Sequence, residues 1–512
     1  MNHPESPNAR PTMLIRLQER PRARGKLFRS STGIGKIGGG GKRRAGNNGR
    51  PVNSDWPYRL NSGLQEDSRD SYGFAFGLLY LFTLLLYVRP NDLIPAMGTF
   101  PLAKIVAIIA PLAYAYAQYQ LGKPIINWTI EVKMVFVMLS LAILFTPIAA
   151  SPSDSVNTLN DVFIKTVIIF ILIIGLINTR ARLKSMLNLT VICGTWLAIF
   201  AIKNYATGNF ELRGVRIAGV VGGIFGNPND LAMALNLLIP LAVALALISA
   251  GRARLLYIAC ALMMTAGVIA TFSRAGFITL VALLGIMVWK FGRGKRVSAG
   301  LATMIASVIL LAALSDAYHT RLSSIFDQNK DQSGSAQERS ALLKRGIDLA
   351  VRHPIIGLGM GNFHIYSIRE KVAHNAYLET AAELGAIGLL AYLILILAPL
   401  RELARIEQKA QRASAPDDLE TKYLSIGLQA VLAAYIVNSF FNSIQYLWYL
   451  YYAAGFAVAL RQIYAAESAA QASAAAAAPP PDQIQPIGRL WKSAPRKPAG
   501  RLWPAYRFRK GF

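Results

Sequence analysis

The chain has 512 residues, of which 54% are hydrophobic and only 16% are charged. Soluble domains carry about 25% charged residues, so the composition excludes an ordinary soluble enzyme. The apolar residues form repeated runs of roughly 17–20 residues, the length that a helix needs to cross a membrane. A transmembrane barrel would show short alternating segments instead. We therefore predict an all-α, polytopic membrane protein.

The formal net charge of +27 lies mainly in two tails and in short loops. Such a charge would suggest nucleic acid in a soluble protein, but membrane topology explains it here, and no nucleic-acid partner is expected. The two cysteines, Cys193 and Cys260, both fall within apolar runs. Neither a disulfide framework nor a zinc site is therefore expected.

The two tails differ in composition from the rest of the chain. Residues 1–71 are basic and rich in Gly, Pro and Ser, without an apolar core long enough for a cleaved signal peptide. Residues 462–512 carry an Ala run, a Pro run and a basic end. We predict both as disordered cytoplasmic tails around a transmembrane domain at 72–461.

About twelve transmembrane helices are predicted. The apolar spans lie at residues 73–88, 102–118, 132–149, 162–178, 186–202, 230–249, 255–272, 276–290, 298–314, 384–400, 423–441 and 445–460. Basic residues follow alternate spans, which places those loops and both termini in the cytoplasm. The opposite loops are then external, including a large one at 316–383 between the ninth and tenth spans.

The large loop is rich in cationic side chains on the side where they are normally scarce. Its Arg, Lys and His residues include His319, Arg321, Arg339, Lys344, Arg345, Arg352, His353, Arg369 and His374. Residues 335–353 have the spacing of an amphipathic helix near the head groups, and Pro354 ends it. The glycines at 357–361 lack the strand–helix–strand context of a dinucleotide site, so a tight turn with close backbone approach is expected.

Four external arginines suit a lipid-linked diphosphate. Arginine binds phosphate oxygens with a bidentate fork and neutralises the charge of a departing diphosphate. The candidates are Arg216, Arg274, Arg321 and Arg345. Arg216 also fits a side chain that snorkels to the interface, and Arg274 a structural residue.

His374 is the candidate general base, because the pKa of histidine lies near the working pH. A lone histidine is more often structural, but its place beside Asn375 at the head of a helix favours a functional role. Asn227, Asn229 and Asp230 open the sixth span, with Asn229 or Asp230 as a helix cap, or with all three as supporting residues of the site. No set of side chains has the spacing of metal ligands, and no cofactor is expected.

The motifs together resemble the O-antigen ligase and O-antigen polymerase superfamily over roughly residues 72–460. They are Arg-Ile-Ala-Gly at 216–219, Phe-Gly-Asn-Pro-Asn-Asp-Leu-Ala at 225–232, Phe-Ser-Arg-Ala-Gly at 272–276, the stretch 345–359, His-Asn-Ala-Tyr-Leu-Glu at 374–379 and Glu-Leu-Gly at 383–385. Members of that superfamily have about a dozen helices and a large periplasmic loop late in the chain.

The resemblance implies metal-independent, inverting transfer of a glycan from undecaprenyl diphosphate to an acceptor hydroxyl at the periplasmic face of the bacterial inner membrane. It maps the loop histidine of the ligases onto His374 and an external arginine onto Arg216. Arg321 and Arg345 both fit the second essential arginine, and Arg274 is a possible assistant.

Several functions remain compatible with the sequence. The acceptor would be lipid A core for a ligase, or another lipid-linked glycan for a polymerase of O-antigen or exopolysaccharide. A third branch of the superfamily transfers the glycan to protein. A twelve-helix transporter or flippase is the rival from another class, but it would show two repeated halves around a central loop.

Overall fold

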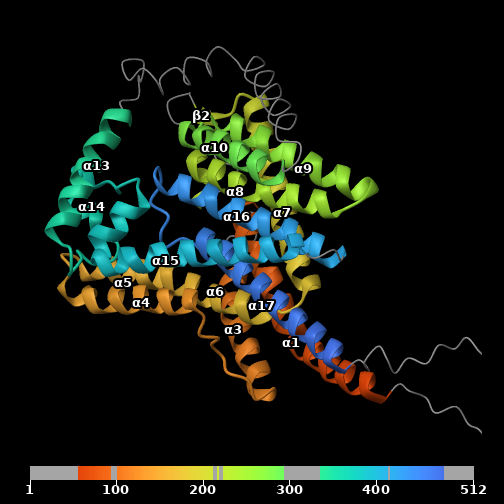
Figure 1. Cartoon of the computed structure of the whole chain (residues 1–512). Helices are drawn as coiled ribbons and strands as arrows, with labels where there is room; N and C mark the ends of the chain where they lie inside the picture. Colours follow the sequence, from red (N-terminus) through yellow and green to blue (C-terminus); the bar gives the residue numbers. More distant parts are fainter. Residues whose placement is uncertain are drawn as a thin grey trace, which may run out of the picture. The chain divides into compact units, whose positions relative to one another are not determined.

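The computed structural model describes residues 56–93, 101–211, 216–217, 223–292, 335–412 and 416–477. The chain divides into two units, Met1–Leu60 and Asn61–Phe512, and only the beginning of one helix is described in the first. The described part of the second unit is almost wholly helical (Figure 1). The predicted all-α class is confirmed.

The elements before the large loop are α1 (Trp56–Val88), α2 (Pro90–Leu93), α3 (Leu102–Gln120), α4 (Ile130–Phe145), η2 (Thr146–Ile148), α5 (Pro152–Thr158), η3 (Leu159–Phe163), α6 (Ile164–Leu176), α7 (Arg180–Ala206), β1 (Phe210–Glu211), β2 (Arg216–Ile217), η4 (Gly223–Gly226), α8 (Pro228–Ile248), α9 (Gly251–Ala270) and α10 (Arg274–Phe291). The later elements are α13 (Ser335–Arg352), α14 (Phe363–Tyr366), η6 (Ile368–Glu370), α15 (Ala376–Arg412), α16 (Pro416–Ser439) and α17 (Trp448–Ala477). The strands β1 and β2 form one short antiparallel pair.

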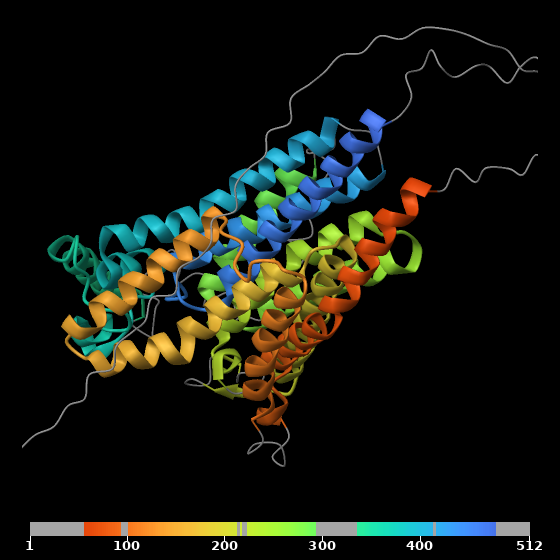
Figure 2. The ribbon, with the colours of Figure 1, turned by 90° about the horizontal axis from the view of Figure 1, so that it is seen from below.

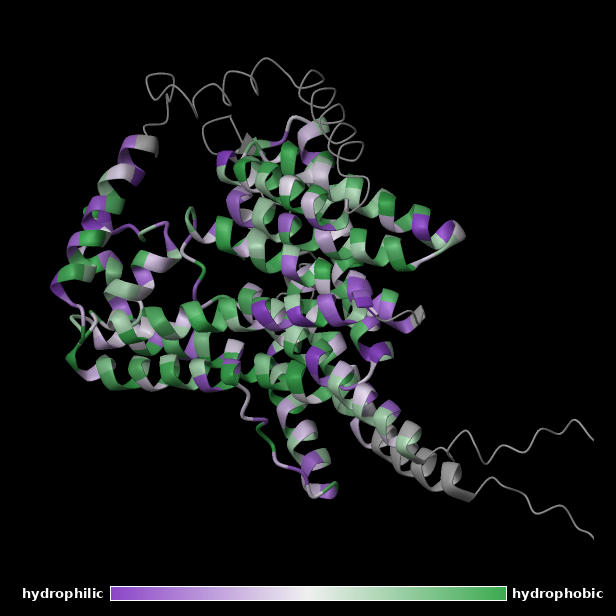
Figure 3. Cartoon of the chain, in the orientation of Figure 1, coloured by the Kyte–Doolittle hydropathy of each residue, from purple (hydrophilic) through white to green (hydrophobic). Residues whose placement is uncertain are grey.

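Among the described residues, nine helical segments are long and apolar enough to cross a membrane. They coincide with the first eight predicted spans and with the tenth. The ninth predicted span, at 298–314, lies outside the described residues. The last two predicted spans are the helices α16 and α17, which are not among the nine. Figure 3 shows apolar residues predominating along α4 and α8, whereas α13 mixes polar and apolar residues.

Three helices extend beyond the predicted boundaries. α1 begins inside the predicted tail at 1–71, and α17 continues to Ala477, inside the predicted tail at 462–512. The extension of α17 follows the Ala run, because alanine has the highest helix propensity. α15 begins at Ala376, inside the predicted loop at 316–383, and its helical geometry is broken at Gly385, next to the predicted start of the tenth span.

α8 lies at the centre of the packing, against α7, α9, α10 and α16. It is apolar on all sides, and 83% of its span is buried, as expected of a helix enclosed by others. Small residues allow its neighbours to approach closely. A Cβ on Gly276 of α10 would lie 2.5 Å from the Cβ of Ala232 in α8.

Ion pairs join the helix ends that the charge pattern assigns to the cytoplasm. They are Arg180–Glu467 at 2.5 Å, Lys184–Glu420 at 3.0 Å, Lys290–Glu407 at 2.9 Å and Arg461–Glu131 at 2.8 Å. These ends therefore lie together, as the predicted alternation of loops requires. Figures 1 and 2 show two of the helix pairs beneath this arrangement, α4 beside α15 and α17 beside α6.

Candidate functional site

The head of α15 carries the predicted residues His374 and Asn375. The Oδ1 atom of Asn375 accepts hydrogen bonds from the backbone N–H groups of Tyr377 and Leu378, both at 3.1 Å. Asn375 is therefore the N-cap of the helix, with a side chain of the type that caps favour. The Tyr377 hydroxyl donates to the carbonyl of Ile436 at 3.0 Å, which fixes this end of α15 against α16.

His374 has a left-handed backbone conformation, with a φ of 51°. This conformation is unfavourable for residues other than glycine, so contacts with surrounding residues must stabilise the backbone of His374. One such contact is direct, because the backbone N–H of His374 donates to the Oγ atom of Ser443 at 3.0 Å. Ser443 belongs to the loop 440–447 between α16 and α17. The base candidate is thus held by a segment almost seventy residues further along the chain.

Glu379 connects the same loop to the residue before His374. Its carboxylate accepts hydrogen bonds from the backbone N–H of Ala373 at 2.9 Å, from Gln445 Nε2 at 3.0 Å and from the Ser443 hydroxyl. Glu379 is only 6% exposed, so these three donors replace the water that a carboxylate would otherwise need. Ser443 therefore joins the Glu379 carboxylate to the backbone of His374.

A second buried carboxylate, Glu383, lies one turn further along α15. It accepts hydrogen bonds from the backbone N–H of Phe363 at 3.1 Å and from the Tyr446 hydroxyl at 2.9 Å. Its own backbone carbonyl accepts from Gly359 N–H at 3.1 Å. A Cβ on Gly357 would lie 2.0 Å from that carbonyl oxygen. The predicted close backbone approach of the glycine turn is confirmed, and α15 is its partner.

The electrostatic environment keeps the His374 imidazole neutral. Burial lowers the pKa of His374 to about 4, and Arg339 and Lys371 act in the same direction, while Glu338 opposes them. Lys371 and Glu338 form an ion pair at 2.5 Å beside it. An imidazole with this pKa is uncharged near pH 7 and able to accept a proton. A polyanion arriving beside it would raise the pKa again.

Arg345 lies on α13, the amphipathic helix that the sequence predicted at 335–353. Its Nε atom donates to the carbonyl of Tyr366 at 2.8 Å, and its guanidinium pairs with Asp348 at 2.8 Å. Asp348 also pairs with Arg352 at 2.6 Å. Arg345 therefore ties α13 to α14, and its role as a diphosphate ligand stays a prediction.

A second group of predicted residues lies where α8 and α10 begin. Asn227 caps α8 by accepting from the backbone N–H of Asn229 at 2.9 Å. Ser273 caps α10 by accepting from Gly276 N–H at 3.1 Å, and its hydroxyl donates to Asn229 Oδ1 at 2.7 Å. Arg274 follows the cap as the first residue of α10. Because this last hydrogen bond joins the cap of α10 to the first turn of α8, Arg274 follows directly after a residue that contacts α8.

α16 connects this second group to the head of α15. The Thr279 hydroxyl of α10 donates to Asn438 Oδ1 at 3.2 Å, and Asn442 Nδ2 donates to the Asn438 carbonyl at 3.4 Å. The loop that carries Asn442 also carries Ser443. Asp230, in the first turn of α8, is half-buried.

The structure does not describe the side chains of two of the predicted arginines, Arg216 and Arg321. The backbone of Arg216 pairs with Glu211 in the short β1–β2 pair, and its side chain is not described. Arg321 lies outside the described residues. Their roles as diphosphate ligands therefore stay predictions.

The sequence analysis gave no site role to five residues of this network, namely Glu379, Glu383, Ser443, Gln445 and Tyr446. Ser443 contacts the backbone of His374 directly, with Glu379 and Gln445 behind it, whereas Glu383 accepts hydrogen bonds from Phe363 and Tyr446. A signal was present, since Glu379 and Glu383 both lie in the motifs just before an apolar span, where buried ionisable residues are functional candidates. Among the described residues, no three His, Cys, Asp or Glu side chains are grouped as metal ligands.

Residues 259–393 match the O-antigen ligase family. The match begins inside α9, covers the large loop and ends in α15, so it contains His374 with its cap and both buried glutamates. The resemblance to the O-antigen ligase and polymerase superfamily is confirmed. Of the predicted arginines, Arg274, Arg321 and Arg345 fall inside the O-antigen ligase match, whereas Arg216 and the loop 440–447 fall outside it. A comparison with curated proteins found no match.

The family indicates membrane glycan transfer of the O-antigen ligase or polymerase type. Substrates of this family are lipid-linked glycans, and the apolar helices agree with a multi-pass bacterial membrane protein.

Proposed function

We propose that the chain moves a glycan from undecaprenyl diphosphate to an acceptor hydroxyl at the periplasmic face of the inner membrane. The reaction would serve O-antigen or exopolysaccharide synthesis, as a ligase or as a polymerase. The observation that carries the proposal is the O-antigen ligase match at 259–393, which contains a neutral histidine held at the head of a helix.

His374 would act as the general base. Its neutral imidazole accepts the proton of the acceptor hydroxyl while the acceptor oxygen attacks the anomeric carbon of the donor sugar. The bond between that carbon and the diphosphate oxygen breaks on the opposite face, so the configuration at the sugar is inverted. Undecaprenyl diphosphate leaves with the bonding electron pair. The developing negative charge nearby raises the pKa of His374, so the imidazole becomes a stronger base when donor is bound.

The external arginines would bind the diphosphate. Support for Arg274 comes from its place as the first residue of α10, directly after Ser273, which contacts the first turn of α8. Arg216, Arg321 and Arg345 complete the proposed set. A guanidinium fork offers two parallel hydrogen bonds to phosphate oxygens and keeps its charge at all relevant pH values. Such groups stabilise a departing diphosphate without needing a proton transfer of their own.

The test is a reconstituted transfer reaction with purified protein and an undecaprenyl-diphosphate glycan. His374→Ala should lower turnover by about 10²–10⁴-fold, the usual contribution of a general base. His353→Ala is the matched control, because His353 lies in the same loop and its ring packs against Tyr366. Full activity of His374→Ala would remove His374 from the chemistry. Longer lipid-linked glycans as product would identify a polymerase, and glycan on core lipid would identify a ligase.

A further inference from the structure

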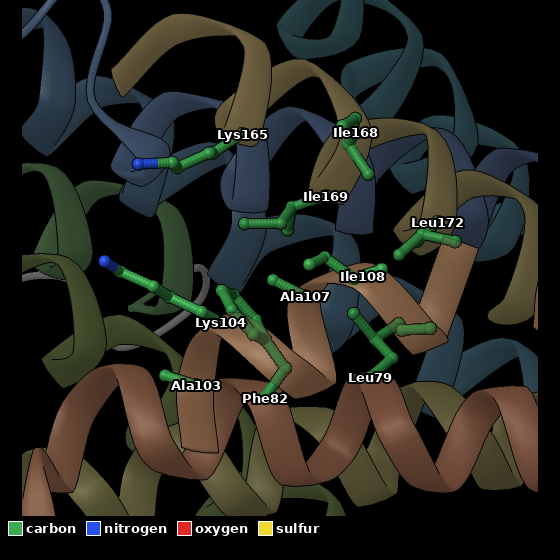
Figure 4. Close-up of a pocket in the computed structure, with 11 residues that line it drawn as sticks. Leu79, Phe82, Ala103, Lys104, Ala107, Ile108, Lys165, Ile168, Ile169 and Leu172 are labelled. Atoms are coloured by element: carbon green, nitrogen blue, oxygen red, sulfur yellow. The ribbon is translucent and has the colours of Figure 1, made fainter. Parts of the chain in front are cut away.

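A cavity of about 390 Å³ lies between α1, α3 and α6, and the described residues that line it include none assigned to glycan transfer. Its lining is apolar except at one end, where Lys104 of α3 and Lys165 of α6 lie. Figure 4 shows both ammonium groups at the same end, while Ile108 and Leu172 lie away from it. An apolar channel with cations at one end matches an amphiphile with an anionic head and a hydrocarbon tail.

The two lysines lie at the same height along their helices. Tyr114 of α3 meets α6 at Gly175, where a Cβ would lie 2.2 Å from the tyrosine hydroxyl. Lys104 precedes Tyr114 by ten positions, and Lys165 precedes Gly175 by ten positions. Each separation corresponds to about 15 Å along the helix. Lys104 and Lys165 are the third and fourth residues of the predicted spans at 102–118 and 162–178, so both lie at the end of their spans, where head groups are expected.

The shape of the cavity follows from the sequence of α3. Ala103, Ala107 and Ala110 recur at helical spacing and line it, so this face of α3 leaves room that larger side chains would fill. Ile108 lines the same cavity and is 63% exposed, which shows that the cavity opens on the outer side of the helix. In a membrane-spanning helix this outer side meets hydrocarbon chains.

The charges at the end of the cavity select among anionic heads. Lys165 pairs with Asp161 at 3.1 Å, so the two ammonium groups and this carboxylate sum to a net charge of +1. That charge matches a singly charged phosphodiester better than a diphosphate, which carries more negative charge. Lysine also binds phosphate as a compact point charge, without the bidentate fork that arginine offers to a diphosphate.

We propose that this cavity binds one anionic phospholipid, with its phosphodiester between Lys104 and Lys165 and an acyl chain along the alanine face of α3. The site is separate from the proposed glycan transfer and would exist whichever reaction the chain performs. A lipid held there fills the space between three helices that otherwise contact one another only partly.

The test is native mass spectrometry of the purified full chain titrated with phosphatidylglycerol or with phosphatidylethanolamine of the same acyl chains. Phosphatidylglycerol should bind more tightly, and Lys104→Gln or Lys165→Gln should each weaken it about fivefold. Ala107→Phe should weaken both lipids, because it fills the cavity and leaves the charges in place. Lys203→Gln, at an exposed lysine on α7, is the control and should change nothing.

Three results would overturn the proposal. The first is equal binding of the two phospholipids, and the second is unchanged phosphatidylglycerol binding in both lysine variants. The third is displacement of phosphatidylglycerol by undecaprenyl diphosphate in a manner that depends on Lys104, since the cavity would then belong to the glycan donor. Exposure of both lysine side chains means that their glutamine variants should fold normally.

Discussion

Replacing Ser443 with alanine tests whether the loop 440–447 positions His374. The hydroxyl accepts the backbone N–H of His374 at 3.0 Å and donates to the buried carboxylate of Glu379. Ser443→Ala removes both interactions without touching the imidazole. Ser443 has no role in the proposed chemistry itself, so we expect its effect on turnover to come from the position of His374.

The expected magnitude follows from the backbone conformation of His374. A left-handed φ of 51° costs a non-glycine residue about 1–2 kcal/mol. A neutral hydrogen bond offsets about 0.5–1.5 kcal/mol of this cost. Without it, the held conformation should become less populated by about 0.5–1.5 kcal/mol, which corresponds to a roughly two- to thirteenfold fall in kcat. This fall is far smaller than the loss expected for His374→Ala.

The pH profile separates positioning from a general loss of stability. Burial is the main cause of the low pKa of His374, about 4, and a base loses activity as pH falls through its pKa. The wild-type acid limb of kcat/KM should therefore lie near pH 4. A released His374 becomes more hydrated, so in Ser443→Ala its pKa should rise and the acid limb should move to higher pH.

The assay is the reconstituted transfer reaction, measured from pH 4 to 8. Ser443→Thr keeps the hydroxyl and should restore most of the activity, and Ser468→Ala on the exposed part of α17 is the control. An unchanged kcat in Ser443→Ala would refute the reasoning. A lower kcat with an unmoved acid limb and a lower melting temperature would refute it too, because the serine would then be only structural.

Two further substitutions should act on stability, measured as the melting temperature in detergent. Arg461→Met leaves the fully buried carboxylate of Glu131 without its partner and should lower the free energy of unfolding by about 3–5 kcal/mol. The double variant Arg461→Met with Glu131→Met should recover most of this stability. Equal losses of stability in the single and the double variant would contradict a specific ion pair. Gly385→Ala places a Cβ 2.7 Å from the Ile355 carbonyl oxygen at a φ of 69° and should cost about 2–4 kcal/mol, while Gly77→Ala, which meets open space, should change stability by less than about 1 kcal/mol.

The sequence was sufficient for features that depend on local pattern. Hydropathy located the spans that the structure describes, and the polar cluster at 227–230 was recognised as the start of a helix, although Asn227 is the cap and not the predicted Asn229 or Asp230. The amphipathic helix at 335–353 was predicted within one residue. Each of these features is decided by residues close together in the chain, where periodicity and capping chemistry act directly.

The contacts that complete the site could not be read in the same way. Glu379 and Ser443 are 64 positions apart, and no local rule pairs a glutamate at a helix head with a serine in a later loop. The partners of Arg345, Asp348 and the Tyr366 carbonyl, were likewise not predicted, and its role as a diphosphate ligand stays a prediction. Tertiary packing, rather than composition, decides which partner each charge takes.

The long-range tie at Ser443 also constrains how the protein matures. During synthesis, His374 emerges from the ribosome before the hairpin of α16 and α17 exists. Until that hairpin enters the membrane, the backbone of His374 lacks the hydroxyl that holds it. The insertion of α16 and α17 thus decides when the candidate base is in place, and a chain synthesised only as far as α15 lacks the hydroxyl that holds His374.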